Sequence, residues 1–228
     1  MIDEPAEVLT RELAGAELDG LVLEPRDFKR GRTDREVYFN LFLSREGRLS
    51  LTPTVQGLFF AGRGDYIKAW VEFRYDPVAV FADGSVVDLE EKGLAPRLFS
   101  LLASLVPPGG SLMVIYGAEA HAVSSDTEKG LKKSFPPAAT PLGYYLWRSG
   151  LRWFKDWYFS EGWMEGGMKL QATRPLNEEV RAGREAKARE ELGAFAAALR
   201  DRDLDPLEKD ALERAEDVLS RLTPAASP

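Results

Sequence analysis

Two side chains that can transfer protons follow the most apolar strand expected in the chain. Glu119 and the single histidine, His121, stand three and five residues after Tyr116, the last residue of a strand predicted over 112–116. Histidine exchanges protons near neutral pH, and a nearby carboxylate can serve as acid or base. Ligands of α/β sheets bind beyond the carboxyl ends of the strands, which is where these two residues are expected. We therefore predict Glu119 and His121 as catalytic residues, with an ordinary loop histidine as the alternative.

A second group of candidates comes from a stretch that is dense in aromatic residues. Nine of the twenty residues from 144 to 163 are aromatic, and Arg148, Arg152 and Lys155 are interleaved with them. Such density is typical of pockets for flat ligands and of protein interfaces, although core packing also explains most of these rings. The predicted ligand contacts are Tyr116, Tyr144, Trp147 and Arg148.

Composition excludes several classes of site and partner. The 228 residues include no cysteine, so disulfides, thiol nucleophiles and thiolate metal sites are excluded. One histidine argues against imidazole metal centres, and we predict no metal site. The net charge of −7 argues against nucleic acid as a general partner.

The same composition bears on where the protein works. The mostly apolar stretch 98–106, which includes two serines, is far shorter than the roughly 20 residues that span a bilayer. The acidic N-terminus has no signal-peptide pattern, so a cytoplasmic location is expected. Few Asn and Gln residues beside abundant Glu and Arg resemble a thermophilic profile, which GC-rich coding also produces.

The first part of the chain predicts a helix and then an antiparallel meander. Pro5 suits the first turn of an opening helix. Residues 37–43 and 67–75 alternate as strands, and 49–60 reads as a strand that Pro53 interrupts. Turn residues separate these segments, as in an antiparallel sheet.

The middle of the chain predicts a change to parallel pairing. Residues 96–106 have one broad apolar face, and 112–116 form a strand without polar alternation, buried on both faces. With a strand near 78–89 they predict one βαβ crossover around 78–116, and hence an α/β (or α+β) fold with a mixed sheet. Farther along we expect a helix started by a Ser125/Glu128 capping box, helical structure over 144–154 and a hairpin over 157–174.

Beyond Pro175 aromatic residues nearly vanish, and the pattern predicts a helical hairpin. Asn177 and Asp205 are expected caps for its two helices. The apolar stripe is too narrow to form a core by itself, so the hairpin must dock on the domain or on a second subunit, which would give a homo-oligomer. We predict an α/β domain over 1–175 and a helical appendage over 176–228.

The passage 105–115, LVPPGGSLMVI, resembles the segment before the fifth strand of class I S-adenosylmethionine-dependent methyltransferases. The resemblance covers about the C-terminal half of that fold, including a closing hairpin near 163–174. It implies S-adenosylmethionine as the cofactor and membership of an uncharacterised prokaryotic family. The glycine-rich cofactor loop of those enzymes has no counterpart upstream.

These observations together predict a protein that binds a small molecule in an enzyme-like cleft and is related to methyltransferases. Residues 117–126 and the aromatic stretch would form that cleft. The alternative is a non-catalytic interaction or scaffolding protein that uses the aromatic stretch and the helical hairpin as interfaces.

Overall fold

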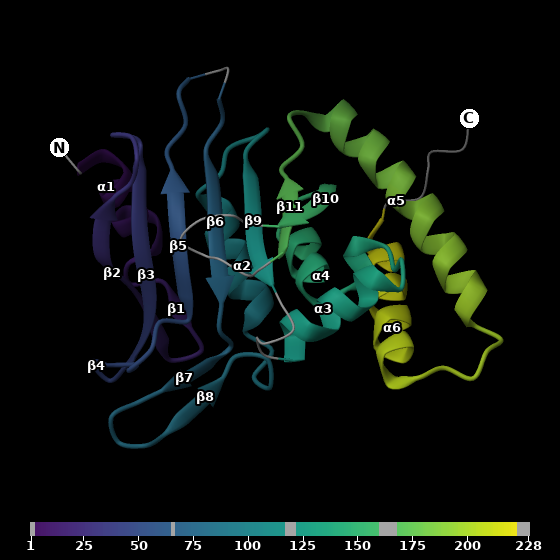
Figure 1. Cartoon of the computed structure of the whole chain (residues 1–228), viewed down its shortest axis with the longest axis horizontal. Helices are drawn as coiled ribbons and strands as arrows, with labels where there is room; N and C mark the ends of the chain where they lie inside the picture. Colours follow the sequence, from purple (N-terminus) through teal and green to yellow (C-terminus); the bar gives the residue numbers. More distant parts are fainter. Residues whose placement is uncertain (1–2, 65–66, 117–121, 160–167, 223–228) are drawn as a thin grey trace.

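A computed structural model describes residues 3–64, 67–116, 122–159 and 168–222 (Figure 1). Within these ranges the chain forms a nine-stranded mixed sheet with helices packed on one of its faces. No helix in the same ranges combines the length and the apolar character that crossing a bilayer requires. The strands of the sheet are β1 (Glu17–Leu18), β2 (Leu21–Arg30), β3 (Glu36–Arg45), β4 (Arg48–Leu49), β5 (Val55–Phe60), β6 (Trp70–Tyr75), β9 (Ser111–Tyr116), β10 (Trp153–Phe159) and β11 (Met168–Thr173).

The sheet confirms the predicted fold class. Its order is β1-β2-β3-β5-β6-β9-β11-β10, with β4 paired to β3. Only β6 and β9 pair in parallel among the described strands, in a register that sets Trp70 beside Ser111. The N-terminal meander is antiparallel throughout, as its turn-separated alternation indicates.

The crossover lies in the predicted region but begins one strand earlier than expected. Strand β6 is the parallel partner of β9, whereas β7 (Val78–Val80) and β8 (Val86–Asp88) pair with each other. The side chain of Asp76 accepts a hydrogen bond from the Val78 amide at 2.9 Å, which forms a turn at Pro77 directly after β6. The β7–β8 hairpin is therefore an insertion between β6 and the crossover helix (Figure 1).

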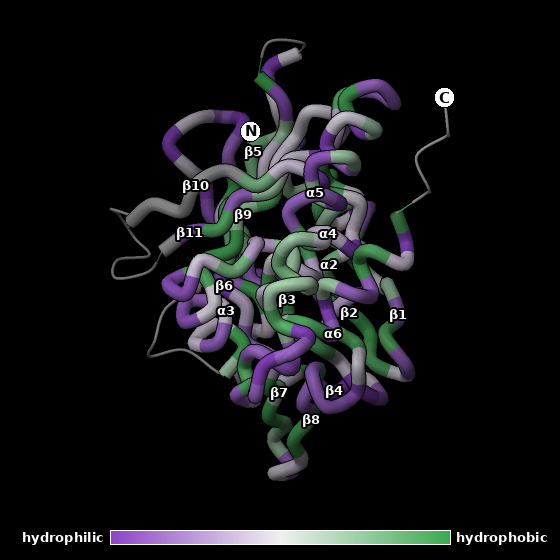
Figure 2. The backbone as a smooth tube through the Cα atoms, turned by 90° about the vertical axis from the view of Figure 1, so that its right-hand side faces the viewer, coloured by the Kyte–Doolittle hydropathy of each residue, from purple (hydrophilic) through white to green (hydrophobic). Residues whose placement is uncertain are grey.

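The crossover helix α2 (Ala95–Ser104) packs its predicted apolar face on the sheet. Phe99 is fully buried and meets Phe73 edge-on, with ring centroids 5.5 Å apart. Tyr75 meets the same ring at 5.3 Å, so the helix is fixed over the carboxyl half of β6. Helices α1 (Asp3–Leu13) and α4 (Pro141–Arg148) both contact α2, and α3 (Ala122–Lys132) contacts β9 and α4 (Figures 1 and 2).

Two local helix predictions are wrong. Helix α3 begins at Ala122, so Ser125 and Glu128 lie inside it, and Glu128 pairs forward with Lys132 instead of capping. Helix α4 ends at Arg148 and does not reach 154. Gly150 has a φ of +89°, and the Leu151 amide bonds to the Leu146 carbonyl, an arrangement that ends helices.

The C-terminal hairpin packs against helices from the middle of the chain. It consists of α5 (Glu178–Leu199) and α6 (Pro206–Arg221), and the predicted caps Asn177 and Asp205 are confirmed. Helix α6 packs against α4 and the short helix η1 (Pro137–Ala139). The apolar cluster between them consists of Phe135, Ala138, Ala139, Trp147, Leu192, Ala211, Ala215, Val218 and Leu222.

A buried ion pair crosses the sheet on the face opposite α2. Glu72 of β6 and Lys169 of β11 are joined at 2.6 Å, with each side chain 11% exposed. Phe73 points toward α2, and because successive strand residues point to opposite faces, Glu72 points away from it. The pair therefore links the two strands that flank β9.

We predict that Lys169→Met destabilises the protein by about 3–5 kcal/mol, because it leaves Glu72 buried without a counter-charge. The double variant Glu72→Leu/Lys169→Met should recover most of this loss, since no unpaired charge remains. Urea unfolding measures both. Equal losses in the single and double variants would contradict the prediction.

Candidate functional site

The predicted site residues that the structure describes do not all gather in one place. Glu119 and His121 lie outside the described residues, so their roles remain predictions. Tyr116 ends β9 and is 1% exposed, and within the described structure its hydroxyl has no hydrogen-bond partner. Trp147 is buried in the cluster beneath the C-terminal hairpin, with the Arg152 guanidinium 4.1 Å from its ring centre.

Tyr144 and Arg148, by contrast, do lie together. Arg148 Nη1 donates to the Tyr144 hydroxyl at 2.7 Å, and that hydroxyl donates to Asp217 on α6 at 2.8 Å. Burial, and then the hydrogen bond to Asp217, raise the pKa of Tyr144, so its hydroxyl stays protonated at neutral pH. These contacts connect the predicted ligand residues to the C-terminal hairpin.

The strongest concentration of titratable groups surrounds Glu90, a residue that the sequence did not indicate. The Tyr75 hydroxyl donates to Glu90 Oε1 at 2.8 Å, and the Tyr145 hydroxyl donates to Oε2 through a short hydrogen bond. Tyr75 is the last residue of β6, Glu90 lies between β8 and α2, and Tyr145 lies on α4. We call these three residues the Glu90 cluster. Tyr75 is buried, while Glu90 and Tyr145 are half-buried and reach solvent.

Local backbone chemistry places Glu90 in this cluster. The Asp88 carboxylate accepts hydrogen bonds from the amides of Glu90 at 2.8 Å and Glu91 at 3.3 Å, which forms a turn directly after β8. Gly93 has a φ of +65°, a conformation that glycine adopts without steric cost. The chain then enters α2 at Ala95, with Glu90 on the side of the turn that faces Tyr75.

Burial sets the protonation of the cluster. It raises the pKa of the Glu90 carboxyl, and the two tyrosine hydrogen bonds only partly oppose this rise. Burial and the negative charge of Glu90 also raise the pKa values of Tyr75 and Tyr145. The tyrosines therefore remain hydrogen-bond donors, and Glu90 is the group that exchanges a proton.

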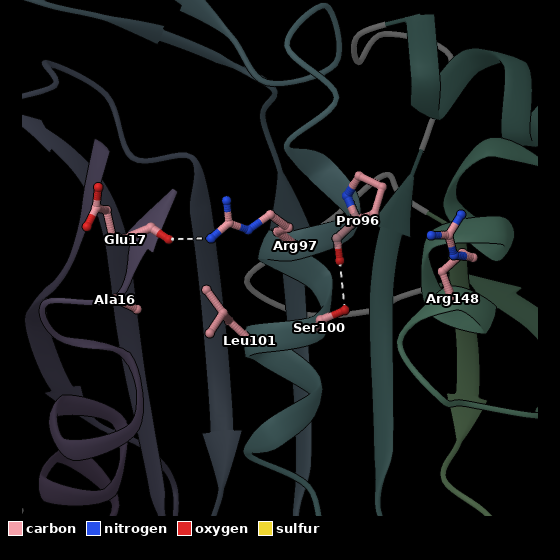
Figure 3. Close-up of a pocket in the computed structure, with 7 residues that line it drawn as sticks. All are labelled: Ala16, Glu17, Pro96, Arg97, Ser100, Leu101 and Arg148. Carbon is pink, nitrogen blue, oxygen red and sulfur yellow. Dashed lines mark hydrogen bonds between the residues drawn. The ribbon is translucent and has the colours of Figure 1, made fainter. Parts of the chain in front are cut away.

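An open groove runs over the outer face of α2 (Figure 3). Its volume is about 380 Å³. The cluster does not line this groove, but Tyr75 and Tyr145 contact the same helix through the Phe99 ring. On one side of the groove, Arg97 donates to the Glu17 carbonyl at 3.1 Å. On the other side stands Arg148, which donates to Tyr144, the residue that precedes Tyr145 of the cluster. The lining residues are Ala16, Glu17, Pro96, Arg97, Ser100, Leu101 and Arg148.

The sequence contained only a weak signal for the Glu90 cluster. Tyr75 continues the alternation Val71, Phe73 and so reads as an ordinary core residue. Its hydroxyl needs a partner when buried, and this requirement was the one available clue. That partner is distant from Tyr145 in the chain, and only the fold brings the two together.

Within the described part of the chain, no group of three or more His, Asp or Glu side chains is arranged to bind a metal ion. The Glu90 cluster holds a single carboxylate and two protonated hydroxyls, which is a proton-exchanging set and not a cation site. Such a set can donate or accept a proton.

Comparisons with known proteins give similarity without an activity. A family model described as "Protein of unknown function (DUF1122)" matches residues 19–200. The search of curated proteins finds no match. Among solved structures, the chain is similar to a crystal structure of a protein of unknown function from Aquifex aeolicus VF5, with 25% identity and a TM-score of 0.63 over 92% of this chain and 98% of that one. Neither description mentions methyltransferases, so that resemblance remains a prediction.

We predict that Glu90 makes stability depend on pH just above its ordinary pKa of 4.5. The folded state holds the proton where the unfolded state has lost it, so the free energy of unfolding falls as pH rises from 4.5 through the raised pKa. Glu90→Gln should remove this part of the dependence in urea unfolding at several pH values. The exposed neighbour Glu91→Gln should follow the wild-type profile, and a Glu90→Gln profile parallel to wild type would contradict the assignment.

Proposed function

We propose that this chain, which belongs to the family described as "Protein of unknown function (DUF1122)", binds a small molecule and transfers a proton to or from it. One observation carries the proposal: a carboxyl group held by two tyrosine hydroxyls stands where the parallel strands end. Glu90 is the proton-exchanging group, and Tyr75 and Tyr145 orient it.

Topology supports this location. Strands β6 and β9 run in the same direction, so their carboxyl ends lie at the same end of the sheet, and α2 begins at that end (Figure 1). Ligands of α/β sheets bind in such places, where two neighbouring strands lead into different connections. Here β6 leads into the β7–β8 hairpin, and β9 leads toward α3.

The chemistry of the cluster suits proton transfer. A carboxyl with a raised pKa is a better acid–base catalyst near neutral pH than an exposed one, because its pKa is closer to the working pH. Two fixed hydroxyl donors stabilise its ionised form while the proton is on the ligand. Glu119 and His121 follow β9 in sequence and remain predicted partners in the reaction.

The groove on the outer face of α2 supports a small ligand over a large partner. Arg148, one of the predicted ligand contacts, lines it, and Arg148 donates to Tyr144, a second one. The C-terminal hairpin, the interface of the alternative proposal, buries its apolar stripe on its own domain through Ala211, Ala215 and Val218. This docking leaves less apolar surface for a scaffolding role or for a homo-oligomer built through the hairpin.

A more specific version of this proposal is a methyltransferase-related activity, with S-adenosylmethionine as the predicted cofactor. The βαβ crossover and the β10–β11 hairpin support it, since both match the outline of that fold. The antiparallel strands upstream of β6 supply no glycine-rich cofactor loop. The cofactor is therefore one probe among several.

We predict that a panel of small carboxylates, nucleotides and S-adenosylmethionine contains a compound that raises the melting temperature. Saturation at about 100 times Kd should raise it by roughly 5–10 °C through binding linkage. Glu90→Gln and Tyr145→Phe should reduce the shift at least several-fold in differential scanning fluorimetry.

The control for this screen is Gln56→Ala, an exposed position on the opposite face of the sheet, which should keep the full shift. A panel without any stabilising compound would count against the proposal. An undiminished shift in both cluster variants would show that the ligand binds elsewhere.

A further inference from the structure

We propose that the C-terminal hairpin contributes a ligand-binding residue to this site: Arg214 of α6, which binds an acidic group, carboxylate or phosphate, of the small molecule. The inference rests on the proposed function and names the class of its ligand. It also gives the hairpin a part in the site and not only in stability.

The hydrogen-bonding state of Arg214 is the first observation. Its side chain is 24% exposed, and its Nη2 atom is 3.8 Å from Asp210, a weak contact within one helix. Nη1 is buried and has no hydrogen-bond partner in the described structure. Buried guanidinium N–H groups are almost always paired, and the planar fork of arginine fits the two oxygens of a carboxylate or phosphate.

The position of Arg214 is the second observation. It stands three residues before Asp217, so the two side chains share one face of α6. Asp217 accepts the hydrogen bond of Tyr144, whose ring centre is 6.1 Å from that of Tyr145. Arg214 thus projects from the same face of α6 that meets the tyrosine pair, and Tyr145 belongs to the Glu90 cluster.

The electrostatics agree with this placement. The charge of Arg214 acts to lower the pKa values of both Glu90 and Tyr145, against the larger effect of burial. No contact of 4.0 Å or less joins Arg214 to Glu90 among the described ion pairs. The two charges are therefore close enough to interact and far enough apart for the guanidinium to bind another oxygen.

The other cation at this place is already engaged. Arg148 donates to Tyr144 at 2.7 Å and contacts Asp217 at 3.5 Å. A chain of net charge −7 repels anions in general, so an acidic ligand requires a dedicated positive group. Arg214 has the free donor and the charge for that role.

The test titrates wild-type protein with inorganic phosphate and, separately, with succinate, at constant ionic strength set by sodium chloride. We expect saturable stabilisation by at least one of them in scanning fluorimetry, and a binding constant at least tenfold weaker in Arg214→Gln. Stabilisation by phosphate alone identifies a phosphate-bearing ligand, and stabilisation by succinate alone identifies a carboxylate.

The control variant is Arg200→Gln, which removes an exposed arginine from the same hairpin and should bind as wild type does. Arg214→Lys keeps the charge and the aliphatic stem, so it should bind with intermediate affinity even if the glutamine variant folds poorly. Equal binding by wild type, Arg214→Gln and Arg214→Lys would overturn the proposal, and so would the lack of any saturable effect in wild type.

Glu90→Gln separates this inference from the proposed function. Anion binding that is lost in Arg214→Gln but kept in Glu90→Gln supports the anion site at Arg214. If, in addition, no compound of the panel depends on Glu90, the proposed proton transfer is wrong while the anion site stands. A panel ligand that depends on Glu90 but is indifferent to Arg214→Gln leaves the proposed function standing and overturns the role of Arg214.

Discussion

The parallel pairing of β6 with β9 is the constraint on which the rest of this structure depends. Antiparallel neighbours can be joined by tight turns, but a parallel pair requires a crossover that returns the chain to the end of the sheet where the first strand began. Helix α2 makes that return, and the packing of Phe99 on Phe73 and Tyr75 fixes it to the sheet. The carboxyl ends of β6 and β9 and the first residues of α2 consequently lie at the same end of the sheet, where Glu90 bonds to Tyr75.

Helix α4 joins this end of the sheet to the apolar cluster beneath the C-terminal hairpin. Tyr145 packs against Phe99 and bonds to Glu90, while the preceding residue, Tyr144, bonds to Asp217 of the hairpin. Trp147, on the same short helix, is buried among hairpin residues. The Glu90 cluster therefore lies near the meeting point of two apolar clusters. Ligand sites are common in such positions, because side chains from several elements converge there.

Much of the fold was predictable because it follows from local patterns. The alternation of the meander, the apolar face that includes Leu98 and Leu102, and the caps Asn177 and Asp205 each determine their element through neighbouring residues. The partner of β9 was harder to predict, since strand pairing depends on contacts between residues far apart in sequence. Ser125 and Glu128 failed as a capping box because the same spacing also occurs inside helices, where Glu128 pairs with Lys132.

The Glu90 cluster shows the same limit at the level of the site. Tyr75, Glu90 and Tyr145 come from three elements, and no spacing in the sequence relates them. NMR of protein with isotope-labelled tyrosine rings, titrated with the compound that stabilises it most, shows whether this cluster binds the ligand. The Tyr75 and Tyr145 resonances should shift with the binding curve, while that of Tyr38, on the opposite face of the sheet, should not. Saturable binding that leaves Tyr75 and Tyr145 unshifted would contradict this assignment of the site.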